Sequence, residues 1–432
     1  MKELEILNSE TQMVAMPLDK PFRLAFGTLE NLPRVYLKLK AQDEAGKMLE
    51  SIGEASIDFP FSNYDAWDVY NSLKNFDLIG KTINNRKLFL TETKENNPFL
   101  SEFPAANAAF NMAIDDLYGK YLDVPVQELY GTVFRDSGYA LSSIPFLENK
   151  QLIQKVSDKF SQGLIPKPKV GQDIENDFDT ISTIDLISHV NQMPFVLDFN
   201  GAYESEDIIL LLKKLRQKGT TFKYLLFIEQ PVEKNSGISS LAYIKSVASS
   251  IFDKDIMVIA DESFVNEEDA IECINNNIGL NIKIQKIGGG VVAKKIDELT
   301  KNKVDSIIGG TFPTVIARTY DQQIACILET AILPGDGWEP STNWFNHERH
   351  FANNQFKRTK DHKFLANSNP GLGLEIAWEK LSKYILENPK DEFRKIRSDK
   401  KSDKLKITLT ERASYKNLYE KTTKKVFDWN LT

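Results

Sequence analysis

Three segments decide the fold: FVLDFN at 195–200, YLLFIEQP at 224–231 and IMVIADES at 256–263. In each of them an acidic residue directly follows an apolar run. Each segment is short, bounded and rich in the residues of buried strands. Stretches with helical spacing of apolar residues follow them, for example 204–218 and 266–277. Strands that alternate with helices predict a parallel sheet, because each helix carries the chain back to begin the next strand.

The same alternation extends along the chain in both directions. Strands are expected at 165–170, 195–198, 224–229, 256–261, 280–283 and 305–309. More than five strand–helix units in one run favour a closed barrel over an open sheet. The predicted fold class is therefore α/β, with a TIM-like barrel.

The regions on either side of the barrel have other patterns. Alternating residues predict strands at 3–16 and 34–41, with a meander through 50–55. The alanine-rich stretch Phe103–Asp123 predicts a helix, so the first 130 or so residues form an α+β unit. After the barrel, a helix is expected over 374–386, followed by a lysine-rich stretch.

Composition excludes several classes of protein. The chain has 432 residues, 41% hydrophobic and 27% charged, with a net charge of −7, as is typical of a globular enzyme. An acidic body argues against a nucleic-acid groove, although segment 381–432 carries 14 lysines and arginines against 8 acidic residues. There is no membrane-spanning run of about 18 apolar residues and no signal-peptide pattern at the start. Two cysteines cannot build a disulfide framework, so we expect a cytoplasmic protein that binds neither nucleic acid nor membrane.

Three acidic residues stand where barrel enzymes carry their chemistry, at the carboxyl ends of strands. Asp198, Glu229 and Asp261 end consecutive strands roughly 30 residues apart, which is one strand–helix unit. Converging carboxylates repel one another unless a cation joins them. Ligation by oxygen alone fits Mg²⁺, or Mn²⁺, better than a softer metal, and none of the four histidines lies at these strand ends. The sequence therefore predicts a divalent-metal site.

Lysines flank this predicted metal site on both sides. Lys167 and Lys169 end the preceding strand, and Lys283 ends the following one. A lysine near a divalent cation in a barrel mouth has its ammonium form disfavoured, so it can act as a base. Any one of these residues alone is better explained as a helix cap or an ion-pair partner. The ordered set favours catalysis, with two lysines acting on opposite faces of one carbon.

At these residues the sequence resembles the enolase superfamily and, within it, the muconate-lactonizing group. The matching pieces are IPKPKVG (165–171), LDFNGAY (197–203), FIEQPV (227–232), IADES (259–263), NIKIQKIGGG (281–290) and NPGLGLEI (369–376), together with PLDKPFRLAFG (17–27), Gly53-Glu54-Ala55 and AAFNMAIDDLYGKYLDVPVQELYG (108–131). The resemblance implies a (β/α)₇β barrel with an N-terminal α+β capping domain. We accordingly divide the chain into a capping domain (1–135), a catalytic barrel (136–345) and a C-terminal segment (346–432) that completes the cap and ends in a basic extension.

The resemblance also implies roles for single residues. These are the metal ligands Asp198, Glu229 and Asp261, the acid–base pair Lys169 and Lys283, the auxiliary cation Lys167, and the orienting residues Asn200 and Glu262. Separately from the resemblance, we expect Thr311, Asp336 and Trp338 to contact the substrate. The implied chemistry is abstraction of the proton α to the carboxylate of a small substrate, with Mg²⁺ bound. The enzyme is expected to form a homo-oligomer.

The last barrel strand departs from the dipeptide epimerases of this group. Those enzymes usually show Asp-x-Asp there, whereas the matching stretch here is PGDGW at 334–338, with a tryptophan in place of the second aspartate. We hypothesise that Trp338, Trp344 and Phe345 contact an apolar part of the substrate; the alternative is that they pack the interface between domains.

Three functions remain open from the sequence. The first is an epimerase or racemase for an amino-acid or dipeptide-like substrate. The second is a syn-dehydratase or cycloisomerase, similar to o-succinylbenzoate synthase or muconate cycloisomerase. The third is a barrel that binds a carboxylate ligand without catalysis. The first two both need the two lysines, so the sequence does not separate them.

Overall fold

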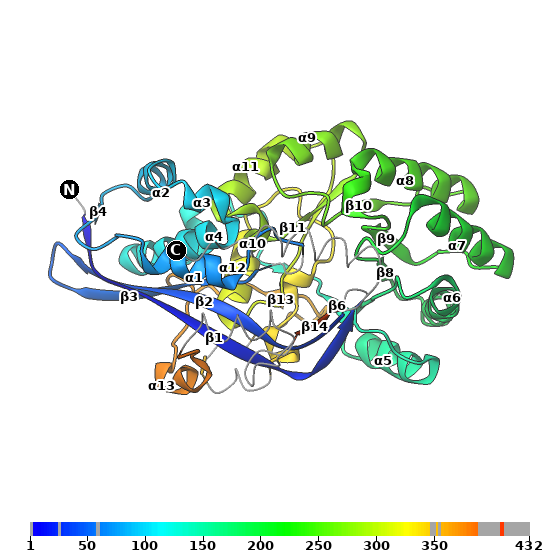
Figure 1. Ribbon diagram of the computed structural model, residues 1–432, viewed down its shortest axis with the longest axis horizontal. Coiled ribbons are helices and arrows are strands. Elements are labelled where there is room, and N and C mark those ends of the chain that lie inside the picture. The colour runs from blue at the N-terminus through cyan, green and yellow to red at the C-terminus, as the bar shows by residue number, and fades with distance from the viewer. Residues whose placement is uncertain are drawn as a thin grey trace, which may run out of the picture.

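The computed structural model describes residues 3–24, 27–57, 61–345, 351–352, 356–387 and 407–409. A long antiparallel hairpin with a layer of helices forms one part of the molecule, and a curled parallel sheet surrounded by helices forms the other (Figure 1). Within these residues, no helix is both long and apolar enough to cross a membrane.

The N-terminal sheet is antiparallel. β1 (Leu4–Leu24) pairs with β2 (Gly27–Asp43), and β2 pairs with β3 (Met48–Ala55). The short strands β4 (Thr82–Ile83) and β14 (Ile407–Leu409) add to β1 and β2. The predicted strands are confirmed, but β1 and β2 are longer than expected and carry their hairpin to the barrel, where the Phe146 amide donates to the Arg23 carbonyl at 3.4 Å.

Helices cover one face of this sheet. They are α1 (Ala66–Lys74), α2 (Arg86–Glu95), α3 (Phe99–Glu102), α4 (Pro104–Leu122) and the 3₁₀ turn η1 (Val126–Tyr130). The predicted helix over 103–123 is confirmed as α4, which begins with Pro104 in its first turn and ends at Asp123 in a left-handed conformation. Its alanines let it approach the sheet so closely that a Cβ on Gly53 would lie 1.8 Å from the Ala109 carbonyl oxygen.

The barrel alternates strands and helices as predicted. Its strands are β6 (Leu141–Ile144), β7 (Ile165–Pro168), β8 (Phe195–Asp198), β9 (Leu225–Glu229), β10 (Val258–Ala260), β11 (Gly279–Ile282) and β12 (Ser306–Ile308). Its helices are α5 (Asn149–Ser161), α6 (Ile174–Asn191), α7 (Ser205–Lys218), α8 (Ile238–Phe252), α9 (Glu267–Asn275), α10 (Ile284–Ile287), α11 (Gly290–Thr300) and α12 (Val315–Ala325), with the 3₁₀ turn η2 (Lys234–Ser236). β8 to β12 form one parallel sheet in sequence order, β6 pairs with β7, and a bridge between Lys169 and Asp198 joins the two sheets.

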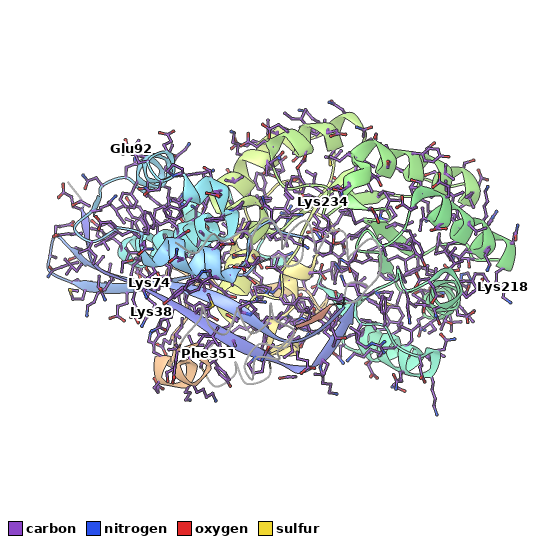
Figure 2. All side chains as sticks on the ribbon, viewed as in Figure 1. Lys38, Lys74, Glu92, Lys218, Lys234 and Phe351 are labelled. Atoms are coloured by element: carbon purple, nitrogen blue, oxygen red, sulfur yellow. The ribbon has the colours of Figure 1, made fainter. Side chains whose placement is uncertain are left out.

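The segment around Gly335 closes the ring between β12 and β6. The amide of Gly335 donates to the carbonyl of Tyr139, and the carbonyl of Gly335 accepts from Leu141. A Cβ on Gly335 would lie 2.3 Å from the Ile308 carbonyl oxygen on β12, so only glycine fits there. Seven strand–helix units followed by a closing segment make a (β/α)₇β barrel. Charged side chains lie on the outer faces, as Glu92 on α2 and Lys218 on α7 show (Figure 2).

The described residues after β12 and α12 are mostly irregular. They include η3 (Asp336–Trp338), η4 (Ser341–Asn343), α13 (Trp378–Leu381) and η6 (Ser382–Tyr384), with β13 (Phe364–Leu365) paired to β5 (Ser137–Gly138). The helix predicted over 374–386 is confirmed only in part: α13 and η6 cover 378–384, whereas Ile376 pairs with Ala352 in an antiparallel bridge that holds the start of the range extended. Most of the basic extension lies outside the described residues, and the domain boundaries at 135 and 345 stay predictions.

Glu54 at the end of β3 joins the cap to the barrel. Its carboxylate accepts from the Thr314 amide at 2.9 Å, the Thr314 hydroxyl at 2.5 Å and the Ala317 amide at 3.1 Å, all at the start of α12. Negative charge at a helix N-terminus is favourable because the amides there have no partner within the helix. Arg34, 3.6 Å from Glu54, also donates to the Thr311 carbonyl at 3.0 Å. This contact fixes the cap on the carboxyl end of the barrel.

Substituting Gly53 by alanine should destabilise the cap strongly. The new Cβ would overlap the backbone of α4, which cannot move away as a side chain could. We expect a loss of about 3 kcal/mol, at the upper end for overpacking, measured as a lower midpoint of urea unfolding. Gly80→Ala is the control, because open space surrounds that Cβ and only the left-handed backbone costs about 1 kcal/mol. Equal midpoints for the two variants would contradict the close approach of β3 and α4.

Candidate active site

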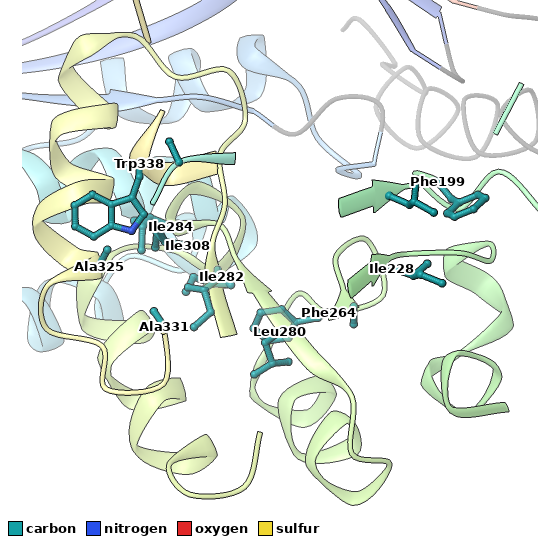
Figure 3. Packing of buried hydrophobic residues seen from close by; sticks show 14 of the residues in the cluster. Phe199, Ile228, Phe264, Leu280, Ile282, Ile284, Ile308, Ala325, Ala331 and Trp338 are labelled. Atoms are coloured by element: carbon teal, nitrogen blue, oxygen red, sulfur yellow. The ribbon is translucent and has the colours of Figure 1, made fainter. Parts of the chain in front are cut away.

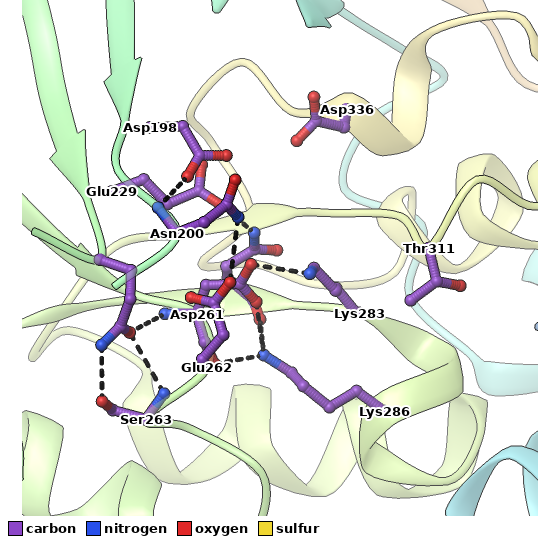
Figure 4. Close-up of polar contacts among 12 residues, drawn as sticks. Asp198, Asn200, Glu229, Asp261, Glu262, Ser263, Lys283, Lys286, Thr311 and Asp336 are labelled. Atoms are coloured by element: carbon purple, nitrogen blue, oxygen red, sulfur yellow. Dashed lines mark hydrogen bonds and ion pairs between the residues drawn. The ribbon is translucent and has the colours of Figure 1, made fainter. Parts of the chain in front are cut away.

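Three buried carboxylates meet at the carboxyl ends of neighbouring strands. Asp198 ends β8, Glu229 ends β9 and Asp261 follows β10, and each is 1% exposed (Figure 4). Because β8, β9 and β10 are adjacent and parallel, their ends present these side chains on the same edge of the sheet. The structure thus places the three residues predicted as metal ligands at one edge of the sheet.

The three predicted lysines bind these carboxylates directly. Lys167 Nζ lies 2.9 Å from Glu229 Oε2 and 3.2 Å from Asp198 Oδ2. Lys169 Nζ forms a short ion pair with Asp198, and Lys283 Nζ lies 2.7 Å from Asp261 Oδ2. All three lysines are less than a tenth exposed. The ammonium groups therefore balance the carboxylates from both sides of the mouth.

Burial and mutual repulsion show in the pKa values of the acids. Burial, together with the charge of Asp198, raises the pKa of Glu229 to about 8. Burial also disfavours the charged form of Asp198, but Lys169 and Lys167 outweigh it and hold its pKa below the usual value. Lys283 and Lys286 outweigh burial in the same way and lower the pKa of Asp261. The charged forms of these carboxylates are therefore stabilised where a lysine ammonium group lies next to them.

The donor set suits a hard divalent cation. Three carboxylates without histidine or cysteine are the oxygen ligands that Mg²⁺ prefers. As the side chains stand, no three acidic, histidine or cysteine residues among those described lie close enough together to hold a metal ion. Instead, one carboxylate oxygen of Asp198 forms an ion pair with Lys169, and one of Asp261 forms an ion pair with Lys283. A bound cation would replace these ammonium groups as the partner of the carboxylates and leave the lysines facing the substrate.

The two predicted orienting residues lie beside the acids. The Asn200 amide donates to Asp198 Oδ1 at 3.0 Å, and its side-chain nitrogen donates to Glu262 Oε1 at 3.0 Å. Burial, followed by the charge of Asp261, raises the pKa of Glu262 to about 8. Asn200 adopts a left-handed backbone with φ 46°, a costly conformation that the surrounding contacts must maintain. These contacts support the predicted role in orienting the acids.

Sequence reasoning missed three further residues at this site. Gln230 accepts from the Asp261 and Ser263 amides and donates to Ser263 Oγ, so it joins the ends of β9 and β10. Asn281 donates to Glu229 Oε1 at 2.8 Å, and Lys286 Nζ lies 2.8 Å from Asp261 Oδ1. The signal was present in EQP and NIKIQK, where amide and lysine side chains neighbour the acidic ends of strands.

The three predicted substrate contacts fall in different places. Asp336 reaches the site, since its Oδ2 lies 2.5 Å from Lys167 Nζ and its side chain is 13% exposed. Thr311 binds the cap instead, because its hydroxyl donates to the Ser56 carbonyl at 3.0 Å. Trp338 lies in the hydrophobic core of the barrel with Ile308, and is 1% exposed (Figure 3). A Cβ on Gly138 would lie 2.2 Å from its ring. Its position therefore favours packing over contact with substrate.

The two other aromatic residues of the late segment, Trp344 and Phe345, differ in their burial. Phe345 is fully buried in the core. Trp344 is partly exposed and packs edge-on against Phe22 from the cap hairpin and Phe312 from the loop after β12, with ring centroids 5.0 and 5.4 Å away. Glu339 accepts from the Trp344 ring nitrogen at 3.1 Å and fixes its orientation. These contacts join cap and barrel.

Comparison with known proteins gives one family. A family model described as "Enolase C-terminal domain-like" matches residues 164–380, just over half of the chain. The curated relatives include an L-Ala-D/L-amino acid epimerase from Populus trichocarpa, 26% identical over 74% of this chain and 74% of that protein. They also include the L-Ala-D/L-Glu epimerase of Bacillus subtilis, 24% identical over 73% of this chain and 83% of that protein.

Solved structures share the fold. Muconate lactonizing enzyme from Pseudomonas fluorescens, complexed with muconolactone, aligns with a TM-score of 0.76 at 19% identity, over 88% of this chain and 99% of that one. A dipeptide epimerase from Enterococcus faecalis, complexed with Mg and the dipeptide L-Leu-L-Tyr, aligns with a TM-score of 0.72 at 22% identity, over 86% of this chain and 99% of that one.

Replacing Trp338 by phenylalanine tests its position. Because the indole fills the core, the smaller ring should lower the free energy of unfolding by about 1–3 kcal/mol. The KM for substrate should stay within about twofold, because the side chain does not reach the mouth. Denaturant unfolding and steady-state kinetics measure the two effects. A tenfold rise in KM at unchanged stability would instead favour contact with substrate.

Proposed function

Because the chain belongs to the enolase superfamily, in its muconate-lactonizing group, and is an isomerase, we propose that it is a Mg²⁺-dependent epimerase or racemase. It removes the proton α to the carboxylate of an amino-acid or dipeptide-like substrate and returns it on the opposite face. The cytoplasmic location of the protein and its assembly into a homo-oligomer stay predictions.

One observation carries this proposal: two buried lysines stand on opposite sides of the carboxylate cluster. Lys169 follows β7 and Lys283 follows β11, with β8, β9 and β10 between them. Each lysine pairs with a different acid, Asp198 or Asp261. A carbon held over the middle of the cluster would therefore have one ammonium or amine on each face. Inversion of a stereocentre uses an acid–base group on each face, whereas in an elimination one lysine would act as the base and the other would stabilise charge as an ammonium.

The proposed metal ligands are Asp198, Glu229 and Asp261. When bound, Mg²⁺ would polarise the substrate carboxylate and stabilise the negative charge left by proton removal. A raised pKa for Glu229 means that its carboxylate gains more from a nearby cation than an ordinary glutamate does. Asn281 and Lys167 each hold one oxygen of Glu229, which fixes its orientation.

The proton would move between the substrate and the lysine side chains. One lysine in its neutral form accepts the α-proton at Nζ, and the other, as an ammonium, donates a proton from its Nζ to the other face. The roles reverse for the opposite stereoisomer. Lys167 touches Glu229, Asp198 and Asp336, so its charge is balanced within the protein and it serves as a fixed cation rather than a base.

The substrate class follows from the relatives more than from the site. Both curated relatives described above carry epimerase names that specify an L-Ala-containing substrate. Asp336 is the acid closest to solvent in this mouth, but Lys167 already pairs with it. A substrate ammonium group would have to share Asp336 with Lys167. We therefore propose amino-acid and dipeptide-like carboxylates together as the substrate class to be screened.

Removal of divalent metal should abolish activity. Dialysis against EDTA should remove turnover, and Mg²⁺ or Mn²⁺ should restore it, because three buried carboxylates need a cation when the lysines act on substrate. Glu229→Gln should weaken Mg²⁺ binding, measured by calorimetry on the metal-free protein. Glu204→Gln, at an exposed residue before α7, is the control. Full activity in metal-free buffer would contradict the metal site, and unchanged affinity in Glu229→Gln would contradict that ligand.

The two lysines should divide their work by stereoisomer. In D₂O the wild type should place deuterium at the α-carbon of the product isomer. Lys169→Ala and Lys283→Ala should each lose net turnover by about 10²–10⁴-fold, because each removes one acid–base group. Each variant should still exchange the α-proton of the one isomer that faces its remaining lysine. Proton NMR measures turnover and exchange separately.

Two outcomes would reject the epimerase. Near-normal turnover in both directions by either variant would show that the substituted lysine is not an acid–base residue. A product that lacks one water, with all turnover lost in both variants, would support the syn-dehydratase instead.

A further inference from the structure

Asp261 is held by two lysines that differ in their surroundings. Lys283 Nζ lies 2.7 Å from Oδ2 and Lys286 Nζ lies 2.8 Å from Oδ1. Lys283 belongs to the proposed acid–base pair. Lys286 comes one helical turn later, from α10, and its side chain is 6% exposed (Figure 4).

Lys286 uses all three of its ammonium protons within the protein. Besides Asp261 Oδ1, its Nζ donates to the Asp261 carbonyl at 2.6 Å and to the Asn281 carbonyl at 3.2 Å. An ammonium has three donors, so none is left for a substrate. The ring of Phe264 lies 5.1 Å away and covers the group further. Lys286 is therefore not a base in the reaction, and its contacts are with the backbone and with one proposed ligand.

These contacts connect two strand ends and fix one side chain. The carbonyl of Asp261 follows β10 and the carbonyl of Asn281 lies on β11, so Lys286 joins the two strands that carry Asp261 and Lys283. With Oδ1 occupied, Asp261 cannot rotate freely about its Cβ–Cγ bond. Only Oδ2 is then presented to the mouth.

The turn that carries Lys286 is itself anchored to the cap. Asn107 on α4 donates to the Gly288 carbonyl at the end of α10 with a distance of 2.6 Å. Gly288 and Gly289 have φ values of 98° and 109°, which glycine adopts without strain, and they turn the chain sharply from α10 into α11. The position of Lys286 is therefore rigidly determined by the fold.

We infer that Lys286 is a positioning residue, which holds Asp261 so that only Oδ2 is presented to Lys283 and would be available to a metal ion. This inference rests on the proposed metal site and deepens it. Side chains that orient a ligand typically change metal affinity or activity by about 10–100-fold when removed. A lysine that served only the folding of α10 would leave the metal affinity of the folded protein unchanged.

The test compares variants at Lys286 with a matched lysine elsewhere. Lys286→Met keeps most of the length of the side chain and removes its hydrogen-bond donors. Lys294→Met is the control, because Lys294 on α11 binds Asp297 at 3.0 Å and the Ile327 carbonyl at 3.1 Å, away from the mouth. Mg²⁺ affinity is measured by calorimetry on metal-free proteins whose folding is verified by circular dichroism. We expect about 10–100-fold weaker binding in Lys286→Met and wild-type binding in Lys294→Met.

A second variant separates charge from geometry. Lys286→Arg keeps the charge, but its planar fork cannot reproduce three donors at one nitrogen, so affinity should recover only in part. Wild-type Mg²⁺ affinity in folded Lys286→Met would overturn the inference and leave the proposed function standing. Absence of Mg²⁺ binding in the wild type would overturn both. If neither variant at this position folds, the lysine serves the fold itself and the positioning role is wrong.

Discussion

The repulsion among Asp198, Glu229 and Asp261 is the constraint on which the rest of this structure depends. A parallel barrel brings the ends of adjacent strands together, and these three ends carry carboxylates that are almost fully buried. Charges in such a place are costly unless cations or hydrogen bonds compensate them. Four lysines compensate these charges, and each forms an ion pair with at least one of the three acids: Lys167, Lys169, Lys283 and Lys286. The chemistry that we propose follows from the same balance, because a metal ion that takes over the carboxylates frees Lys169 and Lys283 for proton transfer.

The cap contributes to this site without supplying its acids. Glu54 accepts hydrogen bonds at the start of α12, and burial raises its pKa while Arg34 opposes that rise. Asn107 anchors the turn after Lys283, and Trp344 packs against Phe22 from the hairpin. Cap and barrel therefore share several buried polar contacts as well as apolar ones. Such contacts fix the relative orientation of the two parts, because a polar group that loses its partner in the interior remains costly.

The local pattern of apolar residues was sufficient to predict most strands of the barrel. The strand over 195–198 has the predicted bounds, and the other predicted barrel strands differ from the structure by a few residues at their ends, whereas β6 was not predicted. The candidate site residues could be predicted because the carboxyl ends of consecutive strands are neighbours in this fold. Asp198, Glu229 and Asp261 therefore lie on adjacent strand ends, whatever the sequences of the connecting helices. The helix predicted over 374–386 forms only over 378–384, because at the start of the range Ile376 pairs with a distant residue, Ala352. Contacts of this kind override local preference.

The sequence by itself determined the fold class, the ordered set of acids and lysines and the superfamily, because strand–helix alternation and strand-end positions are local properties of the chain. Only the tertiary structure decided which of the late residues reach the mouth. Asp336 does and Trp338 does not, although two positions separate them, since the turn η3 directs the indole into the core against Gly138. It also decided that Lys286 binds Asp261 while Thr311 binds the cap. Such assignments depend on distances between segments far apart in the chain, and no spacing within the sequence encodes those distances.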